Sequence, residues 1–262
     1  MALRIVQSKQ NPRIKELRSA LLRPGRGESD LIALEGFHLV EEALRSKMQL
    51  QTVFIAQGHE SLLDPLNLPE STEILVVPQE LLAETVTTES PQPIAALTHP
   101  RNWPWDAILT SNALIILLSG IQDPGNLGTI LRSAEAFGAT GVITLPGTVT
   151  RWNPKVMRAS AGSVFRLPTL TSSEAKAFQH LKEAGIRTLA TSSHKAKPLT
   201  NHQLTGPVAI LIGSEGSGLS PELTAQCDAS ITIPCPGPVE SLNAAVAASI
   251  LLYEASRQRS TS

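Results

Sequence analysis

The stretch that decides the fold is LIGSEGSGLSPELTAQCDASITIPCPGPVESLNAAVA, residues 211–247. An aliphatic run at 208–212 predicts a buried strand, and three glycines crowd the loop that follows it. A second strand is predicted to end at 231–233, before a loop with three prolines and a helix that opens at Ser241-Leu242-Asn243. Glycine lets a backbone approach a ligand closely, and proline stiffens the facing loop. Two such loops at the carboxyl ends of strands predict a small-molecule site in an α/β sheet.

Strand and helix patterns alternate through the rest of the chain. Strands are predicted at 31–34, 52–55, 74–77, 94–97, 113–118, 141–145 and 187–191, and helices after Asn11-Pro12, after Gly36, at 81–85 and from 127 to about 137. Prolines and tryptophans interrupt the pattern near residue 103. We therefore predict an α/β protein of two units, residues 1–100 and 112–262, joined by a linker at 101–111. A mostly parallel sheet is expected in the second unit.

Charge is distributed unevenly along the chain. The whole protein carries a net charge of −1, but residues 1–30 hold seven basic and three acidic side chains. Such a segment on a neutral protein predicts a local phosphate-binding surface, with Lys9, Arg13 and Arg18 as candidates. A merely solvated helix face is the alternative, and charge alone gives the two about equal weight.

The sequence also bears on compartment and metals. Cys227 and Cys235 lack the spacing of zinc ligands, so we expect free thiols and no metal. No signal peptide precedes the first charged residues, and the apolar runs are too short to cross a membrane. We expect a soluble, cytoplasmic protein.

Three polar blocks follow predicted strands of the second unit. They are NLGTILRSAEAFGA at 126–139, the glycine loop, and IPCPGPVESLNAAVAASI at 233–250. Each alone is a weak signal, because an asparagine at a helix start is commonly a cap and a lone arginine commonly a solvated side chain. The unit lacks a GxGxxG dinucleotide fingerprint and a GxxxxGK[ST] phosphate loop, which disfavours dehydrogenases and NTPases.

Together and in this order, the three blocks resemble the SpoU (TrmH) family of RNA 2′-O-ribose methyltransferases, which use S-adenosylmethionine. The first unit is similar to the family's N-terminal RNA substrate-binding domain, through SKQNPRIKEL, LEGFHLVEEAL and TTESPQPIAAL. The resemblance implies a C-terminal trefoil knot, a homodimer with the site near its interface, and ribosomal RNA more than transfer RNA as substrate. General rules of chain topology argue against knots, so the knot rests on the resemblance alone.

The resemblance also implies roles for individual residues. Catalytic positions match Asn126, Arg132, Glu215, Ser241 and Asn243, and cofactor positions match Gly213, Ile233, Leu242, Thr191 and Ser192. A cation near the 2′-oxygen stabilises the negative charge that develops there, and we assign this role to Arg132. A guanidinium is a poor proton acceptor, although a base role stays open.

Two other readings remain. One is a catalytically silent RNA-binding or ribosome-assembly protein on the same scaffold, and the other is a nucleotide-dependent oxidoreductase. The complete set of polar motif residues disfavours the first, and the missing glycine fingerprint disfavours the second. The sequence does not reveal which nucleotide of which RNA is modified.

Overall fold

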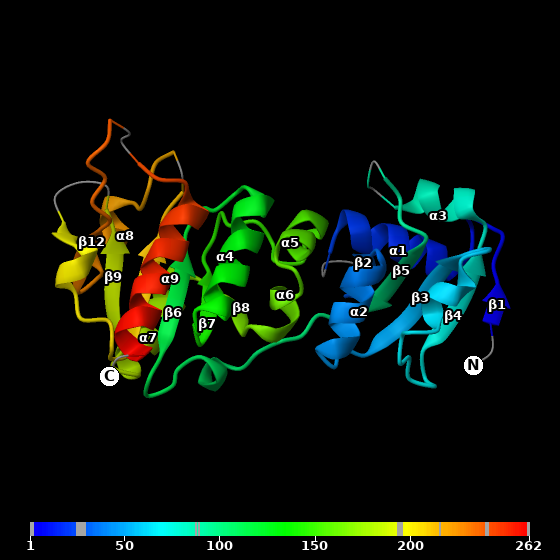
Figure 1. Ribbon diagram of the computed structural model, residues 1–262, viewed down its shortest axis with the longest axis horizontal. Coiled ribbons are helices and arrows are strands. Elements are labelled where there is room, and N and C mark those ends of the chain that lie inside the picture. The colour runs from blue at the N-terminus through cyan, green and yellow to red at the C-terminus, as the bar shows by residue number, and fades with distance from the viewer. Residues whose placement is uncertain are drawn as a thin grey trace. The chain divides into compact units, whose positions relative to one another are not determined.

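The computed structural model describes residues 3–24, 30–86, 88, 90–192, 196–214, 216–238 and 241–260. The chain forms two compact units, Met1–Arg101 with Trp152–Phe165, and Asn102–Arg151 with Arg166–Ser262 (Figure 1). The segment 152–165 contains α5 (Pro154–Ala159), which packs against β2 (Ile32–Glu35) of the first unit. It therefore belongs structurally to the first unit, although it lies within the second along the chain. The domain boundaries at 100 and 112 stay a prediction about where each function resides.

The first unit is a five-stranded mixed sheet in the order β1-β4-β3-β5-β2. Strand β5 is antiparallel to both β3 and β2, whereas β1, β4 and β3 run parallel. The remaining elements are β1 (Leu3–Ile5), β3 (Leu50–Ala56), β4 (Glu73–Val77), β5 (Ile94–Thr98), α1 (Pro12–Leu22), α2 (Phe37–Arg45) and α3 (Gln79–Thr85).

Helix α1 begins as the sequence predicts. Asn11 is its N-cap and accepts a hydrogen bond from the Arg13 amide at 2.9 Å, and Pro12 takes the first helical position, where no N–H is needed. Leu17 is buried on the sheet side, but Leu22 is 64% exposed. The apolar spacing is therefore a wrong guide at Leu22, because α1 ends at this residue and its side chain does not face the core.

The second unit is built on a seven-stranded sheet in the order β10-β12-β9-β11-β6-β7-β8. Every pairing in it is parallel. The strands are β6 (Leu114–Leu118), β7 (Gly141–Thr144), β8 (Thr169–Thr171), β9 (Arg187–Thr191), β10 (Lys197–Pro198), β11 (Val208–Ile212) and β12 (Ala229–Thr232), and the helices are α4 (Pro124–Ala136), α7 (Glu174–Glu183), α8 (Pro221–Ala225) and α9 (Ala244–Ser260). The short helix α6 (Ser163–Arg166) falls at the boundary, and all of its residues except Arg166 belong to the first unit.

Helices cover both faces of this sheet, which explains the continuous aliphatic strands. Residues from α7 and α8 join a core with alternate residues of β6, β7 and β11, while α4 and α9 pack against each other elsewhere on the unit (Figure 1). Strands β6 and β11 are buried along their whole length. The predicted α/β class with a mostly parallel sheet is confirmed, and the trefoil knot stays a prediction.

The last turn of α9 is tied to two loops of the same unit. The Arg259 guanidinium donates to the carbonyl oxygens of Asn112 at 2.7 Å and Gly206 at 2.6 Å, among other acceptors. Partial burial of this group lowers its pKa. These bonds hold the carboxyl-terminal end of α9 against the segments that lead into β6 and β11. Within the described part of the chain, no helix is both long and apolar enough to cross a bilayer.

Candidate active site

Four neighbouring strands of the second sheet end at one edge. In the order β12-β9-β11-β6 they lie side by side and run the same way, so their carboxyl ends meet. Thr191 ends β9, Gly213 follows β11, and Ile233 follows β12. The parallel arrangement thus brings residues from distant parts of the sequence to one edge, as the motif order predicts.

The glycine loop after β11 closes tightly on itself. The Gly218 amide donates to the Ser214 carbonyl at 3.0 Å, and the two residues form an isolated antiparallel bridge. Gly213 is buried beneath this closure, where an added Cβ would lie 2.2 Å from the Gly218 carbonyl carbon. Only glycine fits at 213, because the obstructing atoms are backbone rather than a flexible side chain.

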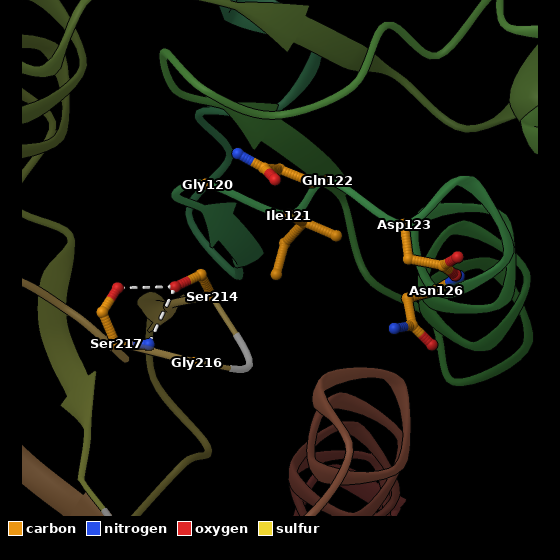
Figure 2. Close-up of a pocket in the computed structure, with 8 residues that line it drawn as sticks. All are labelled: Gly120, Ile121, Gln122, Asp123, Asn126, Ser214, Gly216 and Ser217. Atoms are coloured by element: carbon orange, nitrogen blue, oxygen red, sulfur yellow. Dashed lines mark hydrogen bonds between the residues drawn. The ribbon is translucent and has the colours of Figure 1, made fainter.

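A cavity of about 430 Å³ opens between this loop and the loop after β6 (Figure 2). Its described lining consists of Gly120, Ile121, Gln122, Asp123, Asn126, Ser214, Gly216 and Ser217. Among the residues assigned from the motifs, Asn126 alone is in this described lining. The other seven lining residues were not assigned a role from the sequence. Their only signal in the sequence is that they follow predicted strands closely.

The start of α4 differs from the prediction in one respect. Asp123, not Asn126, is the N-cap, and its carboxylate accepts the Asn126 amide hydrogen at 2.7 Å. Because Pro124 can occupy the first helical position without an N–H, the helix begins three residues earlier than the first apolar side chain suggested. Asn126 therefore lies inside the first turn, and its side chain does not cap the helix.

Two of the sequence motifs meet at this point. The Asn243 carboxamide donates to the Asn126 Oδ1 at 3.1 Å, joining residues 117 positions apart. Asn243 also accepts hydrogen bonds from the amides of Ala245 at 2.9 Å and Val246 at 3.2 Å, so it caps α9. The cap orients the Asn243 side chain, and Asn243 in turn holds Asn126 beside the cavity.

Arg132 lies two turns further along α4. Six residues advance the helix axis by about 9 Å and turn it by about 240°, so Arg132 and Asn126 do not share a face. The Arg132 side chain is exposed, and the described residues offer it no recorded hydrogen bond or ion pair. The structure thus joins Asn126 and Asn243 by a hydrogen bond, and among the described residues it records no bond from Arg132 to either of them.

The other assigned positions have mixed outcomes. Glu215 lies outside the described residues. Ser241 is exposed and Leu242 half-buried, both just before α9. The Ser192 amide donates to the Ile231 carbonyl at 3.0 Å, which links the ends of β9 and β12. None of these roles is tested by the structure, and each remains a prediction.

The donor set at this edge fits S-adenosylmethionine. Gly213 adds no side chain, and Thr191 adds one small hydroxyl, so main-chain N–H and C=O groups at adjacent strand ends are left to recognise an adenosine. Neither described residue carries a positive charge that would repel the sulfonium of the cofactor.

The basic residues of the first unit are partly engaged with carboxylates. Lys9 forms an ion pair with Glu84. The Arg13 guanidinium donates to Glu16 and to Glu73, each at 2.8 Å, and the bond to Glu16 raises the pKa of Arg13. Arg18 is exposed, with no partner recorded among the described residues. Of the three predicted RNA contacts, Arg18 is therefore the most available.

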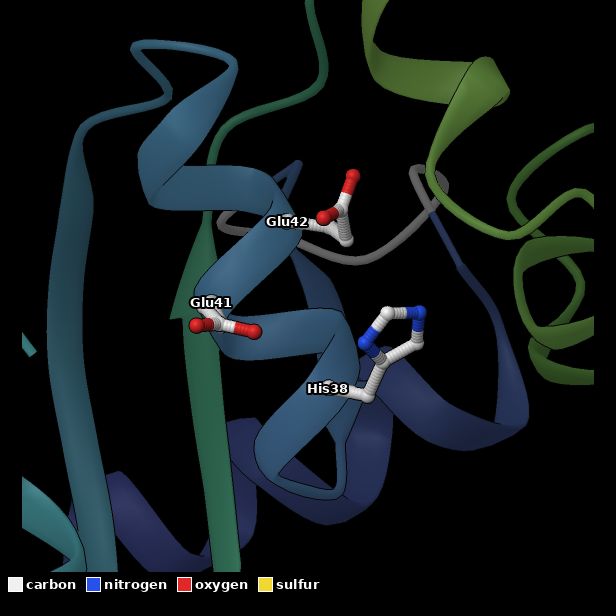
Figure 3. Close-up of side chains that lie close together, drawn as sticks. All are labelled: His38, Glu41 and Glu42. Atoms are coloured by element: carbon white, nitrogen blue, oxygen red, sulfur yellow. The ribbon is translucent and has the colours of Figure 1, made fainter. Parts of the chain in front are cut away.

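One cluster in the first unit has the composition of a metal site. His38, Glu41 and Glu42 on α2 place potential ligand atoms within 4.8 Å of one another (Figure 3). Arg45 binds both carboxylates, Glu41 at 2.9 Å and Glu42 at 3.1 Å. Because both carboxylates already pair with Arg45 at i,i+3 or i,i+4 spacing, the cluster is accounted for as an ion-pair network on α2.

Both units match known protein families. Residues 113–253 match the SpoU rRNA Methylase family, and residues 11–96 match the MRM3-like substrate binding domain. Over 248 residues the chain is 30% identical to the 23S rRNA (guanosine(2553)-2′-O)-methyltransferase RlmP of Bacillus subtilis, covering 95% of this chain and 97% of that protein.

Solved structures agree with these matches. An rRNA methyltransferase from Sinorhizobium meliloti with bound AdoMet superposes with a TM-score of 0.86 at 29% identity, over 97% of this chain and 98% of that one. The SpoU methyltransferase AviRb from Streptomyces viridochromogenes, in complex with AdoMet, gives a TM-score of 0.82 at 27% identity, over 96% and 99%. The predicted family and cofactor are confirmed: the chain belongs to the SpoU rRNA methylase family of S-adenosylmethionine-dependent enzymes.

Proposed function

We propose that this enzyme methylates the ribose 2′-hydroxyl of a guanosine in 23S ribosomal RNA. The observation that carries the proposal is the Asn126–Asn243 pair beside the cavity at the strand ends, in a chain similar over nearly its full length to RlmP. A catalytically silent protein is not favoured, because its relatives of known activity are methyltransferases.

Some residues of the site position the ribose, and one stabilises charge in the transition state. When bound, S-adenosylmethionine supplies a methyl group on a positively charged sulfur. Asn126 and Asn243 position the ribose through neutral hydrogen bonds, each held by its own helix start. Arg132 stabilises the negative charge that develops on the 2′-oxygen as the hydroxyl proton passes to solvent water. Orientation of the two reactants supplies much of the rate, because a sulfonium is already a good leaving group.

We further propose that the enzyme is a homodimer through α4 and α9. These helices pack side by side, and Val246, Ile250 and Tyr253 form an exposed apolar stripe along α9. The Tyr253 ring also meets Phe137, just after α4, edge-on at 5.8 Å. Arg132 is exposed on the adjacent helix. In a dimer through this surface, Arg132 of one subunit acts on the ribose that is bound at the site of the other subunit. This arrangement accounts for the separation of Arg132 from Asn126.

Replacing Ile250 by glutamate should weaken the dimer at least about tenfold, because association would bury an unpaired charge. Methyl transfer should fall with it. Light scattering over a concentration series measures the first effect. Ile5→Glu, at an exposed apolar site of the first unit, is the matched control and should leave the mass unchanged. An Ile250→Glu protein that stays dimeric at the same concentrations would remove this surface from the proposal.

Neutralising Arg18 should weaken RNA binding and lower the slope of log affinity against log salt by about one. Arg13→Gln should have the smaller effect, because Glu16 and Glu73 already bind the Arg13 guanidinium. Filter binding of 23S RNA over a salt series measures both slopes. Equal affinities for wild type and Arg18→Gln at every salt concentration would show that this side chain is only solvated.

The proposed target is tested by mapping 2′-O-methyl groups in ribosomal RNA from cells with and without the gene. Loss of one methylated guanosine in 23S RNA is expected. Loss of a mark in transfer RNA, or at another base, would contradict the proposed substrate while leaving the enzyme class intact.

A further inference from the structure

The cavity at the strand ends is lined by residues other than those assigned to the cofactor. Its described lining contains none of Thr191, Ser192, Gly213, Ile233 and Leu242, the residues assigned to S-adenosylmethionine. It does contain Asn126, which the proposed function assigns to the ribose. The cavity therefore lies next to the reacting sugar and has room of its own, at about 430 Å³, within the ordinary range for small-molecule pockets.

The lining suits a neutral, flat group. Asp123 is the one charged residue among its described members, and its carboxylate already accepts the Asn126 amide. A phosphate would meet an anion there, and the described lining offers no cation to balance it. Ile121, itself only 2% exposed, is the one apolar side chain in the described lining, and Gly120 and Gly216 add no side chains to the walls. Glycine backbone leaves room for a flat base, and neutral polar side chains can hydrogen-bond the edge of an unstacked base.

Ser214 and Ser217 supply the polar wall across from Asn126 (Figure 2). Their hydroxyl oxygens are 2.8 Å apart, and the Ser217 amide also donates to the Ser214 Oγ at 3.3 Å. Two hydroxyls carry two protons, and one proton makes the bond between them. The pair thus has a second proton available for an acceptor outside it, whichever serine is the donor.

We propose that the cavity receives the base of the methylated nucleotide, and that the Ser214–Ser217 hydroxyl pair donates a hydrogen bond to an acceptor atom on the edge of that base. This inference rests on the proposed function, because it takes RNA as the substrate. A base enters such a cavity only after it leaves its stack, so the contact selects nucleotides in loops and other unpaired positions.

The test is steady-state methyl transfer to an RNA fragment that spans the mapped position, with Ser214→Ala, Ser217→Ala and the double variant. Either single variant keeps one hydroxyl to donate, so each should stay within about threefold of wild type in kcat/KM for RNA. The double variant should lose about tenfold, the value of one hydrogen bond. Its S-adenosylmethionine affinity should stay within twofold, because the Gly218 amide still closes the loop on the Ser214 carbonyl.

A second substrate, abasic at the methylated position, identifies the acceptor. On it the double variant and wild type should be equal, since the base contact is already missing. A double variant that matches wild type on intact RNA, or loses the same factor on abasic RNA, or loses cofactor affinity equally, would overturn the inference. A wild-type enzyme that methylates no RNA would instead overturn the proposed function.

Discussion

Replacement of Arg132 by alanine is expected to lower the turnover number for methyl transfer by at least about 100-fold. Groups that stabilise an oxyanion in a transition state are worth roughly 10² to 10³ in rate. The substitution removes an exposed side chain with no recorded partner among the described residues, so the fold should be unaffected. S-adenosylmethionine affinity should stay within a few-fold, because none of the predicted cofactor positions lies on α4. Single-turnover kinetics with labelled cofactor measures the rate, and calorimetry measures the affinity.

Three further variants test the role of Arg132 more closely. Arg132→Lys keeps a cation near the oxygen and should recover part of the lost rate, whereas Arg132→Gln should not. Mixing the Arg132→Ala protein with an Asn243→Ala protein tests action across the dimer: mixed dimers contain one site with both residues intact and should regain activity. Near-normal turnover of Arg132→Ala would remove this residue from the mechanism.

Gly213→Ala is expected to reduce methyl transfer about 100-fold and to weaken cofactor binding at least tenfold. The new methyl group would lie 2.2 to 2.4 Å from backbone atoms of Gly218 and Leu219, so the 214–218 loop must move by about an ångström. A displacement of that size at a site that orients two reactants costs on the order of 10²-fold in rate. Calorimetry and methyl-transfer kinetics, with the thermal midpoint measured alongside, separate site distortion from unfolding.

Gly206→Ala is the matched control, because a Cβ at Gly206 meets no atom within 4 Å. It should leave both cofactor affinity and turnover unchanged. Wild-type kinetics in Gly213→Ala would mean that the 214–218 loop can move without loss of activity. The close packing at Gly213 would then not be needed to position the cofactor.

The strands were predictable where burial leaves a clear pattern. The runs at 113–118 and 208–212 have no polar interruption, because helices cover both faces of their sheet. By contrast, β1 went unpredicted. It has three residues, all of them exposed, so burial leaves no trace of it in the sequence. The packing of 152–165 with the first unit was equally hidden, since local patterns do not say which unit a helix joins.

The site was predictable in its composition but not in its geometry. Motif spelling identified Asn126 and Asn243, and parallel strands explain why they meet. It did not identify Ser214 or Ser217, whose pairing depends on how a five-residue loop closes. Nor did it show that Arg132 lies on a different face of α4 from Asn126. Helical phase alone, at about 240° for six residues, was sufficient to anticipate that separation.

The most direct test of the account is to identify the atom that receives the methyl group. Purified enzyme is incubated with methyl-labelled S-adenosylmethionine and 23S ribosomal RNA from cells that lack the gene, and the RNA is digested to nucleosides and analysed by mass spectrometry. We predict label in 2′-O-methylguanosine, and its loss with Arg132→Ala. Label on a base, or no incorporation into RNA by the wild-type enzyme, would contradict the account.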